Sequence, residues 1–416
     1  MKYFSGIFFL SMCSGIFPTG CREKKEEVAR RPNILLVIND DQTYFHTGFA
    51  GCRFVGTPGF DRVAANGIYF SNCYAGSPGS APSRSALVTG RHHWQNEQSG
   101  QHASSWMKKY VPFVDLLQSE GYHTGYTGKG VEPFRYANDE NDSLWRKGNA
   151  AGTAFNGYRY TKGDPSDSRT AEGIGLVNYY ENFHRFMQQR KAGQPFYFWY
   201  GPTEPHRAYE KNSWKRNGKN LEQADVPGFL PDTEEIRGDM LDYAVEIEWA
   251  DLHLCNMLNY LDSIGELDNT IVIVTADNGM PFPRAKANCF EYGVHVRIDE
   301  RGVHHPEWAF TDVDAAPSKS FLIENHNDPA IRPHFDLAYG KRPEFELYRI
   351  TEDMSCLHNL AGNTEYAAIE NELKAALTKE LTRSGDPRIV GPDKEIFESY
   401  IRYSPIRKFP EPDWMK

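Results

Sequence analysis

Oxygen-bearing side chains directly follow two apolar runs of this 416-residue chain. Asp40 and Asp41 come at the end of one run, and Asp277 and Asn278 come at the end of another. Any one of these residues could be a helix cap or a loop residue, but two such pairs at two run ends point to a shared role. Carboxylates and an amide, with no His or Cys among them, suit Ca²⁺ rather than zinc.

A second set of candidate residues lies in the segment 77–91, Ser-Pro-Gly-Ser-Ala-Pro-Ser-Arg-Ser-Ala-Leu-Val-Thr-Gly-Arg. Ser80 is a good N-cap and Pro82 suits a first helical turn, so we predict a helix that ends at Gly90. The start of a helix favours bound anions, and Arg84 can share a face with Ser80. A hydroxyl nucleophile, a helix dipole and a guanidinium would then meet at one place. A capped structural helix with a solvated arginine fits the same residues.

Continuous apolar runs predict strands that are buried on both faces, as in a parallel sheet. These runs cover residues 33–38, 196–200 and 269–274. Helical patterns lie between them, at 111–120 and 244–261. Strands that alternate with helices predict an α/β sandwich with a mostly parallel central sheet. Ligands bind beyond the carboxyl ends of such strands, which is where the four oxygen-bearing residues and His206 fall.

The last part of the chain has a different pattern. Residues 345–350 alternate like a strand with one exposed face, and residues 367–382 predict an amphipathic helix. Its apolar face carries Ile369, Leu373, Leu377 and Leu381. We therefore predict a small α+β subdomain over residues 299–416, after a main domain over residues 31–298.

The N-terminus reads as an export signal over residues 1–21, with a charged linker over residues 22–30. Lys2 precedes an apolar stretch that is shorter than the ~20 residues of a membrane span. Gly20 before Cys21 resembles a bacterial lipoprotein cleavage site. A simple secretory signal, in which Cys21 has no role, is the alternative. Both interpretations place the mature protein in the periplasm or at the surface of a Gram-negative cell, with membrane attachment only if Cys21 is lipidated.

Composition narrows the function further. The chain has 46 Lys and Arg against 56 Asp and Glu, and the net charge of −10 disfavours nucleic-acid binding. A hydrophobic content of 40% excludes a wholly disordered chain. The cysteines beyond the signal are Cys52, Cys73, Cys255, Cys289 and Cys356. Their spacing argues against a zinc site and leaves one or two disulfide bonds open.

The segment Ser80-Ala-Pro-Ser-Arg84, continued by Thr89-Gly90-Arg91, resembles the signature of the sulfatase family. In that family the first residue, Cys or Ser, is converted to formylglycine, and the serine form implies a radical maturase as a partner. The run Asp277-Asn-Gly-Met-Pro-Phe-Pro283 is most similar to the N-sulfoglucosamine sulfohydrolases, or heparan N-sulfatases. Gln95-Asn96 and Glu204-Pro-His-Arg207 share that similarity. The resemblance covers about residues 31–296 and the chain from 345 onward, and it implies an alkaline-phosphatase-like fold.

The resemblance also implies a role for each candidate residue. Asp40, Asp41, Asp277 and Asn278 would bind Ca²⁺ together with the formylglycine at position 80, which would attack the sulfur. Arg84, Lys129 and Lys286 would stabilise the sulfuryl oxygens, and His206 would protonate the leaving group.

Some neighbouring positions are less clear. Arg284 is an alternative to Lys286, Asn288 falls where relatives carry an Asn, and Val131 stands where the family often has a His. The adjacent His92 and His93 point apart on a helix end, which favours surface or substrate-rim positions over a metal pair.

The chain departs from the family pattern after Val296. A Val-Pro strand, a helix often reading Ala-Pro-Thr and a Gly-Arg-Ser-Leu element are not visible in the sequence, so the C-terminal subdomain is predicted to be shortened. One interpretation keeps the site intact and changes only the substrate rim. In the other, exposed core surface cancels a net stability of only about 5–15 kcal/mol.

The expected function is that of an exported sulfatase that acts on a sulfated oligosaccharide, with N-sulfoglucosamine of heparin or heparan sulfate as the expected unit. Two alternatives stay open. One is a phosphoester hydrolase of the alkaline-phosphatase superfamily that uses an unmodified Ser80. The other is an inactive glycan-binding lipoprotein that results from the shortening.

Overall fold

The computed structural model describes residues 30–139, 141–287, 289, 313–340, 342–391 and 396–403. The chain divides into two units, Met1–Arg31 and Pro32–Lys416, and all the described strands and helices belong to the second. The predicted signal and most of the linker lie outside the described residues, as do Asn288, Val296 and the stretch where the family pattern stops.

A parallel sheet lies at the centre of the second unit, and the prediction of a mostly parallel α/β fold is confirmed. Its five described strands are in the order β5-β3-β6-β1-β7, and all four neighbouring pairs are parallel. The strands are β1 (Asn33–Asn39), β3 (His123–Gly128), β5 (Thr153–Ala154), β6 (Phe196–Gly201) and β7 (Thr270–Ala276). A short second sheet pairs β2 (Ser104–Ser105) with β4 (Phe134–Arg135).

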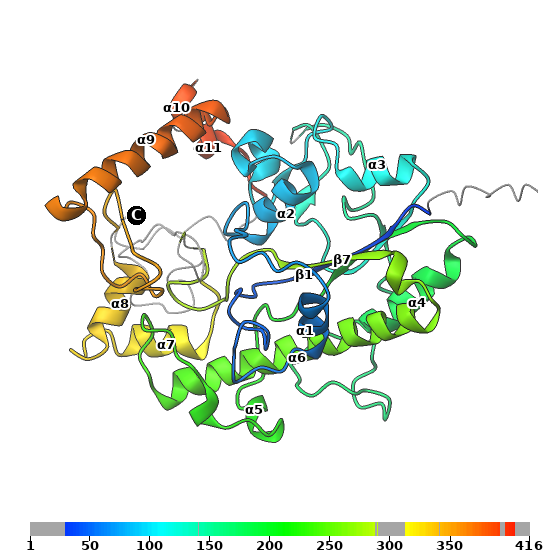
Figure 1. Ribbon diagram of the computed structural model, residues 1–416, viewed down its shortest axis with the longest axis horizontal. Helices are drawn as coiled ribbons and strands as arrows, with labels where there is room; N and C mark the ends of the chain where they lie inside the picture. Colours follow the sequence, from blue (N-terminus) through cyan, green and yellow to red (C-terminus); the bar gives the residue numbers. More distant parts are fainter. Residues whose placement is uncertain are drawn as a thin grey trace, which may run out of the picture. The chain divides into compact units, whose positions relative to one another are not determined.

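Helices cover both faces of the central sheet (Figure 1). On one face, α1 (Pro58–Ala65), α4 (Tyr179–Gln189) and α6 (Glu234–Ser263) pack on alternate residues of β1 and β6, including Leu35 and Phe198. On the other face, α2 (Ser80–Thr89) and α3 (Phe113–Ser119) lie over the intervening residues, including Leu36 and Trp199. Side chains that point to one face of β1 and β6 contact one helix layer, and those that point to the other face contact the second layer. Both strands are therefore buried on both faces.

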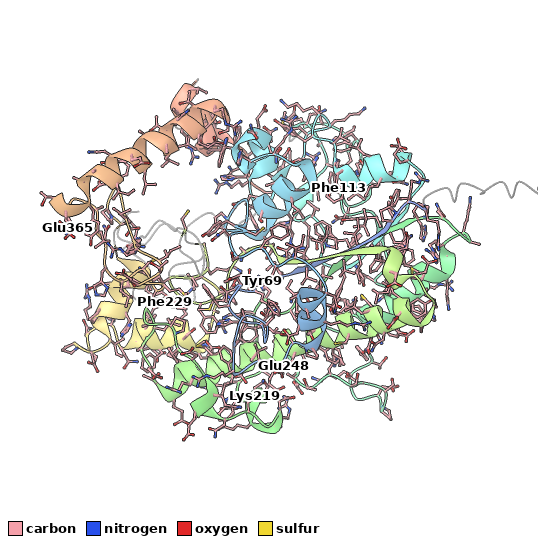
Figure 2. All side chains as sticks on the ribbon, viewed as in Figure 1. Tyr69, Phe113, Lys219, Phe229, Glu248 and Glu365 are labelled. Carbon is pink, nitrogen blue, oxygen red and sulfur yellow. The ribbon has the colours of Figure 1, made fainter. Side chains whose placement is uncertain are left out.

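Phe113 shows how α3 is fixed to the sheet (Figure 2). Its ring lies edge-on to Tyr197 of β6, with ring centroids 5.5 Å apart. Pro112 is the N-cap of α3, and the chain turns after the helix at Gly121, where φ is +86°. The helix predicted at 111–120 is therefore confirmed, with slightly shorter bounds.

β7 differs from the prediction of strands buried on both faces. Val272 and Val274 pack on the α1 and α6 side, whereas Ile271 and Ile273 are 48% and 45% exposed. The prediction is wrong for β7 because this strand is at the edge of the described sheet, and no described helix covers that face of it.

The described C-terminal residues form helices and irregular segments. The helices are α7 (Pro317–Glu324), α8 (Arg332–Tyr339), α9 (Ala367–Arg383), α10 (Pro387–Val390) and α11 (Ile396–Ser399), and α5 (Ser213–Arg216) lies near the start of α6. Short 3₁₀ helices occupy His93–Gly100, Leu221–Gln223, Leu267–Asn269 and Thr364–Tyr366. A hydrophobic cluster joins α7 and α8 to the first half of α6.

The predicted strand at 345–350 is wrong, because this segment is irregular. Leu347 instead exchanges hydrogen bonds with a nearby loop: its N–H donates to Asn359 Oδ1 at 2.9 Å, and its carbonyl accepts from Leu360 N at 2.8 Å. The helix predicted at 367–382 is confirmed as α9, but Ile369, Leu373 and Leu377 on its apolar face are 44–54% exposed.

The described residues also bear on membrane-spanning helices and on disulfide bonds. None of the helices in the described residues has the length and apolar character that a membrane span requires. Among the described cysteines, Cys52, Cys73 and Cys255 carry free thiols.

Candidate active site

The carboxyl ends of β1 and β7 bring the two oxygen-bearing pairs together. The two strands are paired in register up to Asn39 and Ala276, so the residues that come after them are neighbours. Asp277 N donates to Asn39 O at 3.1 Å, and Asp41 N donates to Asp277 Oδ1 at 3.0 Å. The in-register pairing of β1 and β7 thus brings together residues that are 236 positions apart in the sequence.

Asp40, Asp41 and Asp277 form a buried acidic group. One carboxylate oxygen from each lies within 4.8 Å of the others, and all three side chains are buried. Asn278 Nδ2 donates to Asp41 Oδ1 at 2.7 Å, which leaves Asn278 Oδ1 on the side of Ser80, 3.4 Å from its hydroxyl. Three clustered carboxylates and an amide oxygen are the donor set of a hard divalent cation, so these residues fit Ca²⁺.

Ser80 is the first residue of α2, not its N-cap. Gly79 occupies the cap position, with no side-chain hydrogen bond there. The Ser80 hydroxyl instead donates to Asp40 Oδ1 at 3.0 Å, a hydrogen bond strengthened by the charge of the carboxylate. The helix ends at Gly90 with φ of +63°, as predicted. The Ser80 side chain therefore faces the acidic group instead of capping α2.

Arg84 is enclosed beside that group. Its Nε donates to Asp277 Oδ2 at 2.8 Å, and its Nη2 lies 3.5 Å from Asp40 Oδ1. Its Nη1 donates to the carbonyl oxygens of Lys129 and Gly130 at 3.1 and 3.2 Å. With 1% of its surface exposed, Arg84 ties α2 to β1, β3 and β7 at their carboxyl ends.

Lys129 follows β3 and faces the same carboxylates. Its Nζ donates to both carboxylate oxygens of Asp40, at 2.7 and 2.6 Å. Burial by itself would raise the pKa of Asp40, but the charges of Lys129 and Arg84 outweigh it and hold that pKa well below its ordinary value. Asp40 is therefore ionised at any physiological pH.

His206 lies in the loop after β6 and is about one-third exposed. Its Nδ1 is 2.7 Å from the carbonyl oxygen of Arg207, which can only accept a hydrogen bond, so Nδ1 carries a proton. Its Nε2 lies 3.7 Å from Asp41 Oδ2 and faces the site. The atom that can gain or lose a proton there is therefore Nε2.

Lys286 reaches the site, whereas Arg284 does not. Lys286 Nζ contacts Asp41 Oδ2, and although burial acts against its charge, the carboxylates of Asp41, Asp314 and Asp40 raise the pKa of Lys286 above its ordinary value. Arg284 turns away with φ of +66° and donates to backbone carbonyls, including that of Leu337 at 3.1 Å. The alternative assignment to Arg284 is therefore not supported by the geometry.

Two acidic residues near the site, Asp314 and Glu204, were not predicted as site residues from the sequence. Asp314 lies 3.1 Å from Lys286 Nζ, and burial, which would raise its pKa, is outweighed by Lys286 and His206, so that its pKa is lowered. Glu204 was quoted only as part of a motif, yet it is buried and accepts from Tyr179 Oη at 2.6 Å. Burial raises its pKa. Sequence spacing offered no signal for Asp314, which comes after the divergent stretch.

The adjacent histidines lie apart from the acidic group, as expected. The His92 ring stacks on Trp94 with centroids 4.4 Å apart, and His93 Nδ1 lies 2.9 Å from the carbonyl oxygen of Gly76. Asn96 is buried and braces α2 through Ser85 Oγ at 3.1 Å and Thr89 Oγ1 at 3.0 Å. Neither histidine belongs to a metal-ligand group in the described part of the chain.

A polar cavity of about 210 Å³ opens beside the acidic group. It is lined by Asp40, Lys129, Gly173, Gly175, Thr203, Glu204, His206, Arg207, Ala208 and Glu246. The two glycines keep it open, since a Cβ at Gly173 would approach Ala208 O to 2.8 Å. The cavity gives a small polar group access to Lys129 and His206.

A nucleophilic serine at a helix start, a buried acidic group and three cations thus meet at one sheet edge, and the family model described as Sulfatase matches residues 32–305. The chain belongs to the sulfatase family. Sulfatases are sulfuric ester hydrolases, and the alkaline-phosphatase-like α/β fold agrees with the solved structures. A sulfatase-fold protein of Bacteroides fragilis superposes with a TM-score of 0.57 at 17% identity, over 88% of this chain and 98% of that one.

Curated sulfatases with named substrates are also similar to this chain. An N-acetylglucosamine-6-O-sulfatase of Bacteroides thetaiotaomicron is 22% identical over 88% of this chain and 89% of its own. The N-sulphoglucosamine sulphohydrolase of Homo sapiens is 26% identical over 67% of this chain, which spans 57% of that sulfatase. A structure solved in complex with D-glucosamine-2-N,6-O-disulfate has a TM-score of 0.55 at 19% identity, over 86% of this chain and 98% of that one.

Proposed function

We propose that this sulfatase hydrolyses sulfate from a sulfated glycan, with N-sulfoglucosamine of heparin or heparan sulfate as its unit, through a formylglycine made from Ser80 and a bound Ca²⁺. The observation that carries the proposal is the contact of the Ser80 hydroxyl with Asp40, 3.0 Å away, within the group of buried carboxylates and cations. The same hydroxyl lies 3.4 Å from the amide oxygen of Asn278, so it faces two of the candidate metal ligands.

The residues of this chain divide the work at that site. Asp40, Asp41, Asp277 and the Asn278 oxygen would hold the metal, together with the modified residue 80. When bound, Ca²⁺ supplies Lewis-acid polarisation and formylglycine supplies an oxygen nucleophile. Arg84 is fully engaged by its partners, so its role is to fix Asp40 and Asp277 in place.

Lys129 and Lys286 supply positive charge for the sulfuryl oxygens. Each has its ammonium on a carboxylate of the acidic group, Lys129 on Asp40 and Lys286 on Asp41, so that charge is available from two directions. His206, whose Nε2 faces the site from its more exposed side, would protonate the departing nitrogen or oxygen of the sugar. The charges of Arg84, Lys129 and Lys286 balance those of Asp40, Asp41 and Asp277 before Ca²⁺ and the sulfate bind.

A glucosamine substrate is supported by the names of the relatives. Both curated sulfatases described above act, by name, on a glucosamine unit, one at a 6-O-sulfate and the other at an N-sulfate. The Asp277-to-Pro283 motif favours the N-sulfate. We therefore propose the N-sulfate as the bond that is cleaved, and we propose export through residues 1–21, with Cys21 as the point of lipid attachment in a Gram-negative cell, and maturation by a radical enzyme.

Ser80→Ala tests the chemistry. The variant should lose at least ~10³-fold in the rate of sulfate release while its melting temperature stays unchanged, because the hydroxyl stabilises no helix cap. Ser119→Ala, at an exposed position at the end of α3, is the matched control and should keep full activity. Sulfate release by the Ser80→Ala protein would refute the proposal.

Mass spectrometry of the peptide that contains Ser80 tests the modification separately. In protein made together with a radical maturase, conversion of serine to the aldehyde should remove about 2 Da. An unmodified but active protein would favour the phosphoester hydrolase alternative.

A panel of defined disaccharides tests the substrate. Matured protein should release sulfate from N-sulfated glucosamine faster than from 6-O-sulfated glucosamine or 2-O-sulfated uronate. A preference for the 6-O-sulfate would keep the sulfatase assignment and overturn the N-sulfate one. Calcium binding without release from any unit would favour the inactive glycan-binding alternative.

A further inference from the structure

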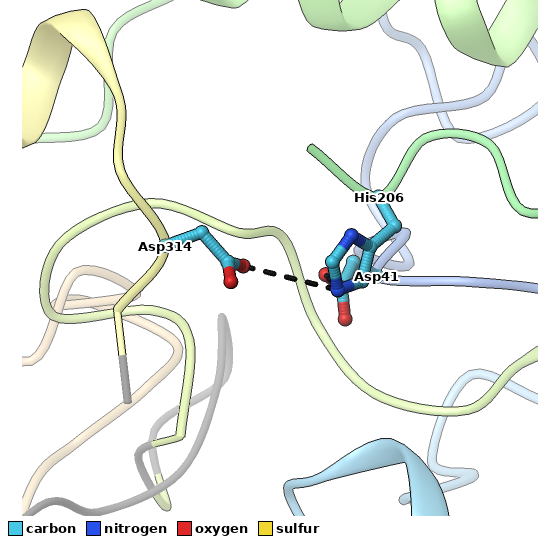
Figure 3. Close-up of side chains that lie close together, drawn as sticks. All are labelled: Asp41, His206 and Asp314. Carbon is cyan, nitrogen blue, oxygen red and sulfur yellow. Dashed lines mark ion pairs between the residues drawn. The ribbon is translucent and has the colours of Figure 1, made fainter. Parts of the chain in front are cut away.

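Besides Asp41, a second carboxylate comes close to His206 and Lys286, from outside the motifs of the site. Asp314 lies between the last residue matched by the family model, 305, and the start of α7 at Pro317. Its Oδ2 is 3.1 Å from Lys286 Nζ and 4.0 Å from His206 Nε2, and Asp41 faces the same Nε2 at 3.7 Å (Figure 3).

The backbone around Asp314 is fixed to the same loop that carries His206. Val313 is 2% exposed, and its carbonyl accepts from Lys319 Nζ at 2.8 Å. Ser318 N donates to Asp239 Oδ2 at 3.2 Å. Arg207, the residue after His206, binds both oxygens of that same aspartate at 2.7 and 2.8 Å. Asp239 therefore holds the Asp314 segment and the His206 loop together.

Asp41, His206 and Asp314 have the spacing of a metal-ligand trio, since one ligand atom from each lies within 4.8 Å of the others. The Lys286 ammonium contradicts a second metal there. It contacts Asp41 and lies 3.1 Å from Asp314, so a cation already bridges the two carboxylates. A divalent ion between Asp41 and Asp314 would have to occupy the position of that ammonium.

Asp314 and Asp41 differ in their other neighbours. Asp41 belongs to the acidic group with Asp40 and Asp277, whereas Asp314 lies outside that group. A carboxylate that also serves as a metal ligand is a weak anchor for an ammonium, because the metal competes for its oxygens. Lys286 needs a second partner that is not a ligand, and Asp314 is placed to be that partner.

We infer that Asp314 is a positioning residue, which holds Lys286 beside His206 so that its ammonium meets the sulfate. The inference rests on the proposed function of the site. Substrate would contact Lys286 and His206, and Asp314 would act only through them. Residues that orient a functional group in this way typically contribute ~10–100-fold.

A double-mutant cycle tests the inference. The variants Asp314→Ala, Lys286→Ala and the double variant are assayed for kcat and KM on N-sulfated glucosamine. Asp314→Ala is expected to reduce kcat/KM by ~10–100-fold in the wild-type background and by less than ~2-fold in the Lys286→Ala background, since the residue acts through that lysine. Asp314→Asn, whose oxygen still accepts from Lys286, should recover part of the loss.

Asp336→Asn on α8 is the matched control. That exposed carboxylate pairs with Arg332 at 2.8 Å, and its loss should leave kcat and KM unchanged. Calcium affinity and melting temperature of Asp314→Ala should also equal those of the wild type. Additive losses in the cycle, or wild-type kinetics of Asp314→Ala, would overturn the inference. Binding of two metal ions per chain, falling to one in Asp314→Ala, would assign Asp314 to a metal site instead.

Binding of inorganic sulfate separates this inference from the proposed function. Sulfate should bind more weakly to Asp314→Ala than to the wild type, and equally to Lys286→Ala and the double variant. If the wild type releases no sulfate from any glycan but this pattern holds, the proposed function fails and the positioning role stands. If glycan sulfate is released but sulfate binding does not depend on Asp314, the positioning role fails alone.

Discussion

Arg84 is the least exposed cation of the site, at 1% exposure. It faces two buried carboxylates and two backbone carbonyls. Lysine could not replace it, because a single ammonium cannot reach acceptors on both sides. In the absence of calcium, the stability of the site therefore depends on this guanidinium.

Replacing Arg84 with Met should destabilise the calcium-free protein by about 3–5 kcal/mol, because Asp40 and Asp277 stay buried with one counter-charge fewer. Calcium should restore most of that loss, since a divalent cation at the same carboxylates replaces the missing charge. Guanidinium unfolding with calcium and with a chelator measures both effects.

Arg146→Met is the control for that prediction. Arg146 pairs with Asp115 at 2.6 Å, and these side chains are 16% and 32% exposed, so the loss should be about 1 kcal/mol or less and should not respond to calcium. Equal losses in the two variants would contradict the prediction.

At the residue scale, most of the candidate site could be predicted from the sequence. Asp40, Asp277 and Lys129 each follow a strand, and the carboxyl ends of parallel strands meet at one edge. Lys286 was preferred from the resemblance, but spacing could not exclude Arg284, because the turn with positive φ that directs Arg284 away does not show in the sequence. Asp314 was out of reach, because only the packing of α7 on α6 brings it to His206.

At the scale of elements, α1 is held by an unusual partner. The carboxylate of Asp251, in the middle of α6, accepts from the N–H groups of Gly59 and Phe60 at the start of α1, each at 2.8 Å. The carboxylate is 1% exposed, and burial raises the pKa of Asp251 from 3.8 to about 6. This contact fixes two helices of one layer to each other.

The pKa of Asp251 predicts a dependence of stability on pH. The folded protein keeps a proton on Asp251 that the unfolded chain has lost above pH 4, so its contribution is fully present below pH 4 and declines as the pH rises to about 6. The loss amounts to about 3 kcal/mol. Denaturant unfolding at pH 4, 5, 6 and 7 should show the stability advantage of the wild type over Asp251→Asn shrinking across this window. A constant difference would contradict the raised pKa.

Two elements show that the hydrophobic pattern alone does not predict where a helix begins or whether a strand forms. Helix α6 begins at Glu234, ten residues before the predicted start. Its first turns bury two acids: Asp239 binds Arg207, and Asp242 accepts from the backbone N–H groups of Asn212 and Trp214. Buried acids break the apolar period, so the pattern missed these turns. The predicted strand at 345–350 failed in the opposite way: alternation was present, but no described strand lies beside it.

At the scale of the whole molecule, the described residues leave two apolar surfaces in contact with solvent. One is the face of Ile271 and Ile273 on edge strand β7, and the other is the stripe of Ile369, Leu373 and Leu377 on α9. The three large hydrophobic clusters around the central sheet and α6 are nevertheless well buried. The balance favours a folded protein with exposed patches over a chain that has lost its core.

An exposed apolar edge strand predicts self-association. Changing Ile271 and Ile273 to Thr should lower the association seen by sedimentation at increasing protein concentration, while the free energy of unfolding changes by about 0.5 kcal/mol or less per site. Val272→Thr, on the packed face of the same strand, should do the reverse: association unchanged, stability reduced by about 1 kcal/mol or more. Equal association of all three proteins would show that the β7 face takes no part.

Because β1 lies between β6 and β7, it cannot pair until those later strands have been synthesised. β1 is the first strand made, but its partners lie far along the chain: Phe196 contacts Asn33 from 163 residues away, and Thr270 contacts it from 237. At about 5–20 residues per second, the run Asn-Ile-Leu-Leu-Val-Ile-Asn leaves the ribosome about 10–30 s before its first partner exists. For that interval this apolar strand needs either a chaperone or transit in the unfolded state.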